Sequence, residues 1–152
     1  MKRLIKLTES DIRNIVKETY EKILKGSLYY HGGDLNYDIW YNGLLWLTPQ
    51  DYYAKEYAKE NNEPIIYKIY IDESKLKAAS IYKIEEIIGD EFDPYEGLNH
   101  EQIKEVLDNR YNCYYMDYDS YNAEGLALLT KDPILNIERM TEEEYNNVEN
   151  FE

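Results

Sequence analysis

The clearest pattern of apolar and polar positions lies near the start of the chain. Apolar side chains recur there at steps of three and four residues, the spacing that lines them along one face of an α-helix. Thr8 is placed to cap this helix, with Asp11 three residues later, and Lys25-Gly26 marks its end. The stripe consists of Ile12, Ile15, Val16, Tyr20, Ile23 and Leu24. We therefore predict a discrete amphipathic helix within residues 1–25.

Two short strands are predicted next. Residues 27–31 form the first, and Gly32-Gly33-Asp34 ends it. Glycines at that point permit a close approach of a ligand to the backbone, which a Cβ atom would block. Residues 44–47 are a second apolar run and form the second strand.

A helix is predicted directly after the second strand. Thr48 takes the N-cap position and Pro49 the first helical position, and the helix runs to about Glu60. Two alanines on one face let this helix lie close to a sheet, while the rings beside them reach past it. This face consists of Tyr53, Ala54, Tyr57 and Ala58.

The remainder of the chain predicts short strands that are not regularly interleaved with helices. Residues 65–71 are β-branched and aromatic, which is typical of a central strand, whereas residues 79–88 fit a strand or a helix. Helices are predicted from Asn99, with Gln102 closing a capping box, and from Thr141. The further strands predicted are 111–116, 126–129 and 134–140. This order of elements favours an α+β fold over a doubly wound parallel sheet.

Composition narrows the class of protein. The chain has 152 residues, 43% of them hydrophobic, which suits one compact domain. Its net charge of −14 opposes binding to a phosphate backbone, so we expect no nucleic-acid partner. No run of 18 apolar residues is present, and the first residues turn polar before a signal-peptide core could form. We expect no membrane association and no secretion by a signal peptide.

Few residues are available for a metal centre. Cys113 is the single cysteine and is predicted to be a small buried side chain, and the two histidines are His31 and His100. The acidic segment 89–97 lacks the spacing of an EF-hand and is predicted to be a solvated loop. We therefore predict no metal site.

Charge divides the chain into two parts. Residues 1–25 carry seven basic and four acidic side chains, a net charge of +3, whereas residues 26–152 carry a net charge of −17. We interpret residues 1–25 as a basic leader helix and residues 26–152 as the main domain. The leader either packs its apolar stripe on its own domain or docks on another chain, and its separate charge favours docking.

Tyrosine is the dominant aromatic residue, with 18 copies against two Phe and two Trp. Phenol rings can fill a thin core while the hydroxyl stays in water, or they can line a cleft for a planar ligand. Composition leaves both possibilities open.

Three segments resemble the ADP-ribosyltransferase fold. In that family one strand ends in His-Gly, a second strand leads into a helix with a stacking tyrosine, and a glutamate begins a later strand. The matching segments are Tyr30-His31-Gly32, residues 45–57, and Glu124 ahead of the run 126–129. The resemblance spans roughly residues 28–140. It implies an α+β domain with split mixed or antiparallel β-sheets and flanking helices, preceded here by the N-terminal amphipathic helix.

The resemblance also implies a pocket for NAD, used as a substrate. His31 would bind a ribose hydroxyl, and the backbone of Gly32 would pair with the nicotinamide amide. Tyr57 would stack on the nicotinamide ring. The other cofactor-binding residues implied are Trp46, Thr48 and Tyr53.

The catalytic residues implied are His31 and Glu124. Glu124 would bind the ribose 2′-hydroxyl and oppose the positive charge that develops as nicotinamide leaves, or would activate the acceptor. A second register of the resemblance, anchored on Asp132-Pro133, places Ala127 at the catalytic position and implies an inactive enzyme. Both registers stay open on sequence alone.

The leader, which begins Met-Lys-Arg-Leu-Ile-Lys-Leu-Thr-Glu, is similar to one found on assorted small proteins of crAss-like bacteriophages. This implies a phage protein located in the host cytoplasm or the virion. The expected function is NAD-dependent mono-ADP-ribosylation of a host or virion protein. The alternative is a catalytically inactive, virion-associated structural or cargo protein that keeps the transferase fold. A third and weaker hypothesis is an acidic decoy that blocks a basic host surface.

Overall fold

The structure is a computed structural model that describes residues 7–35 and 44–150. Side chains at positions 21–24 lie outside the described residues, so Ile23 and Leu24 of the predicted stripe are not placed. The helices are α1 (Glu9–Lys25), α2 (Asp51–Glu60), α3 (Ile81–Ile88), α4 (His100–Asp108) and α5 (Glu142–Asn147), with 3₁₀ turns η1 (Glu73–Lys75) and η2 (Asp119–Tyr121). The strands are β1 (Ser27–Gly32), β2 (Leu45–Leu47), β3 (Ile66–Ile71), β4 (Cys113–Tyr118), β5 (Ala123–Leu128) and β6 (Ile134–Arg139).

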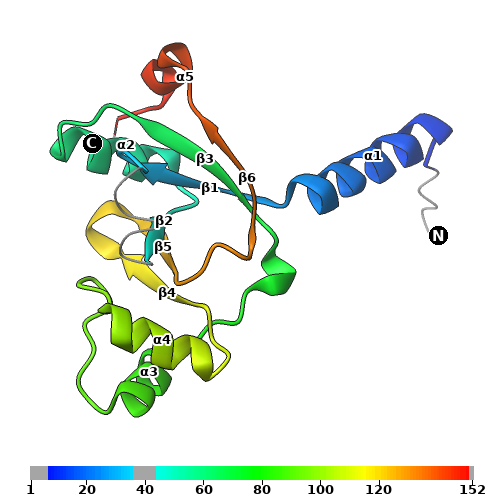
Figure 1. The fold of residues 1–152 in the computed structure, drawn as a ribbon. Coiled ribbons are helices and arrows are strands. Elements are labelled where there is room, and N and C mark those ends of the chain that lie inside the picture. Colours follow the sequence, from blue (N-terminus) through cyan, green and yellow to red (C-terminus); the bar gives the residue numbers. More distant parts are fainter. Residues whose placement is uncertain (1–6, 36–43, 151–152) are drawn as a thin grey trace, which may run out of the picture.

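The strands form two small antiparallel sheets, in the orders β1-β3-β6 and β2-β5-β4. Helices flank both sheets, so the predicted α+β class is confirmed (Figure 1). The segment 65–71, predicted to be a central strand, forms β3 between β1 and β6.

A pair of backbone hydrogen bonds joins the two sheets. The N–H of Tyr30 in β1 donates to the carbonyl oxygen of Thr48 at 2.8 Å, and the N–H of Thr48 donates to the carbonyl oxygen of Tyr30 at 3.0 Å. Buried apolar side chains fill the space between the sheets, and this burial stabilises their packing. They include Tyr29, Ile69 and Ile71 from the first sheet and Leu45, Leu47, Cys113, Leu126 and Leu128 from the second.

The outer face of each sheet carries its own helices (Figure 1). α3 and α4 cover the β2-β5-β4 sheet, where Ile84 and Val106 are buried with Tyr114. α2 lies on the other sheet, where Ala54 is buried with Ile66. The predicted close packing of the alanine face of α2 is confirmed, since Ala54 and Ala58 are both buried.

Local signals located several helix ends. The predicted capping box is present, because the N–H of Gln102 donates to the Asn99 side chain at 2.9 Å and the Gln102 side chain accepts the N–H of Asn99 at 3.0 Å. The ambiguous segment 79–88 forms the helix α3. Ser80 caps its start, and Gly89 ends it in the left-handed conformation at a φ of 71°.

The prediction that Thr48 caps α2 is wrong. The backbone of Thr48 stays paired with Tyr30, so α2 begins only at Asp51, with Gln50 in the cap position and no side-chain cap hydrogen bond. Pro49 therefore precedes the helix. The local rule failed because a tertiary backbone pairing, which local sequence does not report, competes for Thr48.

The strands of the second sheet extend differently from the prediction. β5 begins at Ala123 rather than at 126, and β4 spans 113–118 rather than 111–116. Tyr118 pairs with Ala123 across the hairpin, which adds residues to both strands. Glu124 and Gly125 interrupt the apolar pattern, so the hydrophobic signal starts only at Leu126.

Two further predictions concern Cys113 and the acidic loop 89–97. Cys113 is buried between the sheets as predicted, and burial raises the pKa of its thiol to about 11. The loop 89–97 is exposed at six of its nine residues, in agreement with the prediction, but it also contributes to the core. Phe92 is buried in the cluster under α3 and α4, and the hydroxyl of Tyr114 donates to the carbonyl oxygen of Pro94 at 2.7 Å.

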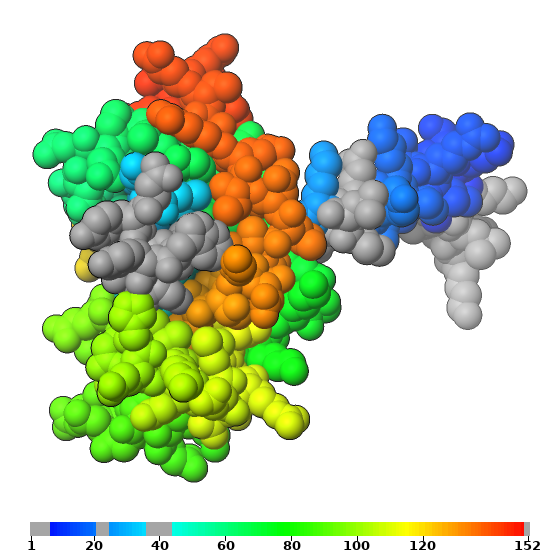
Figure 2. Space-filling model, viewed as in Figure 1, coloured from blue at the N-terminus to red at the C-terminus, as the bar shows by residue number. Residues whose placement is uncertain are grey.

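The leader helix α1 stands apart from the rest of the molecule (Figures 1 and 2). Its cap is present, since the N–H of Asp11 donates to the hydroxyl of Thr8 at 3.1 Å and the Asp11 carboxylate accepts the N–H of Thr8 at 3.0 Å. Residues 7–20 are all exposed, so this part of the stripe does not pack on its own domain. Over the described residues, no helix has the length and apolar character needed to cross a membrane.

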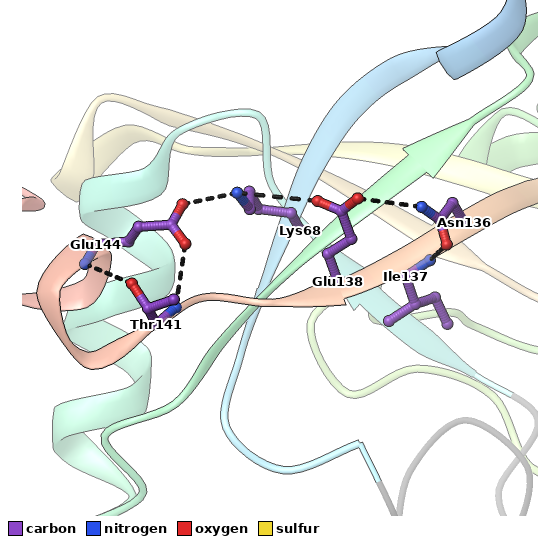
Figure 3. Close-up of polar contacts among 6 residues, drawn as sticks. All are labelled: Lys68, Asn136, Ile137, Glu138, Thr141 and Glu144. Carbon is purple, nitrogen blue, oxygen red and sulfur yellow. Dashed lines mark hydrogen bonds and ion pairs between the residues drawn. The ribbon is translucent and has the colours of Figure 1, made fainter.

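Lys68 of β3 forms ion pairs that connect α5 to the sheet (Figure 3). Its ammonium group donates to the carboxylate of Glu144 at 2.7 Å and lies 3.9 Å from that of Glu138. Glu144 also completes the capping box with Thr141 at the start of α5. These hydrogen bonds lower the pKa of Glu144, and the one with Lys68 is the main cause.

We predict that Lys68→Met lowers the melting temperature at neutral pH and has little effect in acid. Because folding lowers the pKa of Glu144, the stabilisation is complete above the usual carboxyl value of 4.5 and is lost as the pH falls through the folded value. Circular dichroism from about pH 7 to about pH 2 should show the melting-temperature difference shrinking toward zero.

The control for this experiment is Lys83→Met, which removes an ion pair with Glu86 along the surface of α3. We expect it to change the melting temperature little at any pH, as is usual for such pairs. A Lys68→Met difference that does not depend on pH would contradict an electrostatic role and would assign the effect to packing of the lysine stem.

Candidate functional site

A pocket of about 200 Å³ opens where β1, the end of β2 and α2 meet. Residues 30–32, residues 46–48 and one face of α2 line it, and Tyr95 and Tyr118 complete it. The lining includes all six residues implied for cofactor binding, namely His31, Gly32, Trp46, Thr48, Tyr53 and Tyr57. Pockets for whole drug-sized ligands usually measure about 300–1,000 Å³, so this one suits a single ring-sized group.

His31, like Thr48, is a buried polar residue of the pocket, and His31 has 3% of its surface exposed. Its Nδ1 lies 2.8 Å from the carbonyl oxygen of Trp46. A carbonyl oxygen only accepts, so this contact places the ring proton on Nδ1 and leaves Nε2 as the acceptor of the neutral imidazole. The end of β2 therefore sets both the orientation and the tautomer of His31.

Gly32 brings α2 directly onto β1. A Cβ atom at Gly32 would lie 2.1 Å from the carbonyl oxygen of Ala54 and 3.2 Å from the backbone nitrogen of Ala58. The glycine pattern predicted that a ligand could approach the backbone closely here. At Gly32 this close approach is made by the backbone of α2 instead. It holds Tyr53 and Tyr57 of α2 beside His31.

Tyrosine rings form one wall of the pocket. Tyr53 stacks on Tyr118, with ring centroids 4.5 Å apart and an interplanar angle of 26°. Tyr121 meets the Tyr53 ring edge-on at 5.0 Å, and Tyr95 lies against Tyr118 at 5.7 Å. Tyr57 is 43% exposed and lines the pocket from α2, so it presents a ring surface to an incoming ligand. Of the two uses of tyrosine that composition left open, the structure contains both.

The stacked phenols of Tyr53 and Tyr118 remain neutral over the ordinary pH range. Burial raises the pKa of Tyr118 to about 12, partly offset by a hydrogen bond with Tyr53. Burial is also the main cause of the raised pKa of Tyr53. A neutral phenol can stack and donate a hydrogen bond but does not serve as a general base near pH 7. The wall therefore suits an uncharged or cationic planar ring.

Glu124 lies outside the pocket. It is exposed in a neighbouring polar depression that shares Tyr118 with the pocket. Gln50 connects the two, because its side-chain oxygen accepts the N–H of Glu124 at 2.8 Å and the hydroxyl of Thr48 at 3.2 Å. The start of β5 is thus held near the pocket, while the Glu124 carboxylate is not among the groups that line it.

The pleat of β5 determines which of its side chains share the face of Trp46. Directly paired residues of antiparallel strands lie on one face, and Ala127 pairs with Trp46. Side chains alternate along a strand, so Gly125 shares this face and Glu124 is on the opposite one. The ring of Tyr118 covers Gly125, where a Cβ atom would lie 2.5 Å from Cε2. The Trp46 face of β5 therefore carries no carboxylate.

Two residues of the pocket were missed by sequence reasoning. Tyr95 lies in the loop predicted to be solvated, and its hydroxyl donates to the carbonyl oxygen of Asp117 at 2.6 Å. Tyr118 follows the segment predicted as a strand. The useful signal was the alternation Tyr114, Met116, Tyr118, which continues one face of β4 to the pocket.

The described part of the chain offers no cluster of three or more His, Cys, Asp or Glu side chains able to hold a metal ion. The polar groups of the pocket are histidine, hydroxyl and backbone groups. They are of the kind that hydrogen-bond an organic ligand.

Comparison with known proteins found no matching family model, no matching curated protein and no matching solved structure.

We predict that Gly32→Ala destabilises the fold. The added methyl group would overlap the Ala54 carbonyl, and overpacking of this kind typically costs about 1–3 kcal/mol. Urea unfolding monitored by circular dichroism measures the change. Gly89→Ala is the comparison, because a Cβ atom at Gly89 would meet no atom within 4 Å. Its only expected cost is the strain of an alanine at a left-handed φ of 71°, about 1 kcal/mol of unfolding free energy. If Gly32→Ala destabilises the protein no more than Gly89→Ala does, the prediction is wrong, and α2 can shift away from β1.

Proposed function

We propose that this chain binds the nicotinamide end of NAD in the pocket beside His31, on a fold of the ADP-ribosyltransferase type. One observation carries the proposal: the residues implied by the His-Gly motif and by the strand-to-helix motif line the same pocket. The two small antiparallel sheets with flanking helices agree with the split-sheet arrangement that the resemblance implies.

The chemistry of the pocket matches the proposed ligand. Nicotinamide is a planar ring that carries positive charge in NAD, and Tyr57 offers it a partly exposed aromatic face. His31 lines the pocket with Nδ1 held at the carbonyl oxygen of Trp46, and in the proposed complex its buried Nε2 becomes the acceptor for a ribose hydroxyl once the ligand opens the pocket around the ring. The pocket is large enough for one ring-sized group, so the remainder of NAD would extend from it.

Mono-ADP-ribosyl transfer is the first function that such binding permits. The bond between nicotinamide and ribose breaks, its electron pair leaves with nicotinamide, and a nucleophile of the acceptor protein bonds to the ribose carbon. Glu124 is the proposed group that opposes the developing positive charge. Its support is the Gln50 link, which holds the start of β5 near Thr48.

A non-catalytic function is favoured by the position of Glu124. Glu124 is exposed on the β5 face opposite Trp46, whereas Ala127, which the alternative register assigns to the catalytic position, is buried and pairs with Trp46. A pocket without a carboxylate beside the ribose would bind NAD and not cleave it efficiently. The chain would then be an inactive, virion-associated structural or cargo protein that keeps the transferase fold. Of the two functions we propose this one.

We predict that NAD and nicotinamide each raise the melting temperature, because a ligand that binds only the folded state stabilises it. Tyr57→Ala should weaken nicotinamide binding by about 3- to 10-fold, the equivalent of one aromatic stack. Isothermal titration calorimetry measures the affinity. Tyr82→Ala is the matched control, since this tyrosine is exposed on α3 away from the pocket. Absence of any thermal shift in the wild type would end the NAD proposal.

We predict that labelled NAD is neither transferred nor hydrolysed at a substantial rate, and that Glu124→Gln leaves any residual rate unchanged. The assay incubates the full chain with host lysate and follows both labelled protein and free nicotinamide. Removing a transition-state contact typically lowers the rate by about 10²- to 10³-fold, so a loss of this size on Glu124→Gln would contradict the prediction. That result would make the chain a transferase with Glu124 as its catalytic carboxylate.

A further inference from the structure

α1 presents an apolar surface outside the domain. Five apolar side chains at and just before the helix are between 50% and 62% exposed, and they are Leu7, Ile12, Ile15, Val16 and Tyr20. Single exposed apolar residues are common on protein surfaces, whereas a stripe along one helix face marks an interaction surface. This surface lies far from the pocket, at the opposite end of β1 (Figure 1).

The junction between α1 and β1 at Gly26, here called the root of α1, directs the helix away from residues 27–150, the body of the molecule. Gly26 has a φ of 76°, and a Cβ atom there would lie 2.4 Å from the carbonyl oxygen of Ile71 and 2.8 Å from Cδ1 of Leu135. The chain is thus pressed against β3 and the start of β6 as the helix leaves. Leu135 is itself 42% exposed beside this root.

We propose that α1 pairs with α1 of a second copy of this chain, with the two helices antiparallel. Pairing centred on Val16 sets Ile12 of each copy against Tyr20 of the other. It also brings Leu7 of each copy toward the root of the other helix, where Leu135 is exposed. The exposed apolar groups at both ends of α1 are then covered together.

Charge favours this occupant and this direction. α1 carries four basic and four acidic side chains, so two copies of the helix meet without net repulsion, whereas residues 26–152 carry −17 and two such bodies repel at short range. A 17-residue helix is about 25 Å long. Antiparallel pairing leaves the two acidic bodies at opposite ends, well beyond the Debye length of about 8 Å. Parallel pairing would bring them side by side.

The size of the contact sets its strength. Two helices of this length form an interface in the small class, below about 1,200 Å². We therefore expect a reversible dimer that forms with rising concentration. The competing occupant of an amphipathic helix is an anionic lipid surface, which the neutral charge of α1 and the net charge of −14 of the chain both disfavour.

Sedimentation velocity of the full chain, from about 1 µM to about 500 µM, tests the proposal. The mass should rise from 18.2 kDa toward twice that value. Val16→Asp should abolish the rise, because it puts a charge at the centre of the contact. Asn14→Asp adds the same charge on the opposite face of α1 and should leave dimerisation unchanged. A mass that stays at 18.2 kDa throughout, or a dimer that survives Val16→Asp, would overturn the proposal.

Oxidative cross-linking tests the direction of the helices. Ile12→Cys and Tyr20→Cys chains are mixed and oxidised, and antiparallel pairing predicts mainly the mixed disulfide, whose Cα atoms must come within about 7 Å. Cys113 is buried between the sheets and stays in place. A majority of Ile12→Cys homodimers would mean parallel pairing. Wild-type chain that sediments as a monomer and binds phosphatidylserine vesicles would assign the stripe to a membrane surface and overturn the proposal.

Discussion

The backbone pairing of Tyr30 with Thr48 is the constraint on which the pocket depends. These two hydrogen bonds hold the end of β1 beside the end of β2, and they bring His31 within 2.8 Å of the carbonyl oxygen of Trp46. They also keep Thr48 in extended backbone, so that α2 begins later and crosses β1 at Gly32. A buried histidine requires a polar partner, and the sheet junction supplies it.

The chemistry available at this junction is aromatic and neutral. The hydrogen-bonded imidazole and the stacked phenols Tyr53 and Tyr118 surround a space the size of one ring. Burial keeps the phenols protonated, so they provide surfaces and donors rather than charge. The nearest acidic group considered for catalysis, Glu124, is attached to the same framework through Gln50 but projects from the other face of β5. In the function proposed above, recognition of a planar ligand would use the aromatic pocket, whereas cleavage of a glycosidic bond would need the carboxylate of Glu124 outside it.

The leader helix and the domain differ in where they place their apolar side chains. The domain buries its apolar residues between and outside two sheets, whereas α1 keeps its apolar stripe in solvent over residues 7–20. α1 itself has no net charge, whereas residues 26–152 carry −17. At Gly26, whose φ is 76°, the chain lies against the carbonyl oxygen of Ile71, and from there α1 extends away from the domain (Figure 1).

Sequence alone determined those features that depend on neighbouring residues. The periodicity and caps of α1, the capping box at Asn99, the β-branched strand β3 and the α+β class all follow from local spacing and were predicted. The six residues proposed to hold a cofactor were named from the resemblance to the ADP-ribosyltransferase family, and the structure places all six around one pocket.

Tertiary structure decided what depends on contacts between distant segments. It kept Thr48 in extended backbone, brought Tyr95 and Tyr118 to the pocket, and placed Glu124 on the face of β5 opposite Ala127. The physical reason is that strand register and sheet pairing are set by long-range packing. A shift of one residue moves a side chain to the other face without any change in local sequence.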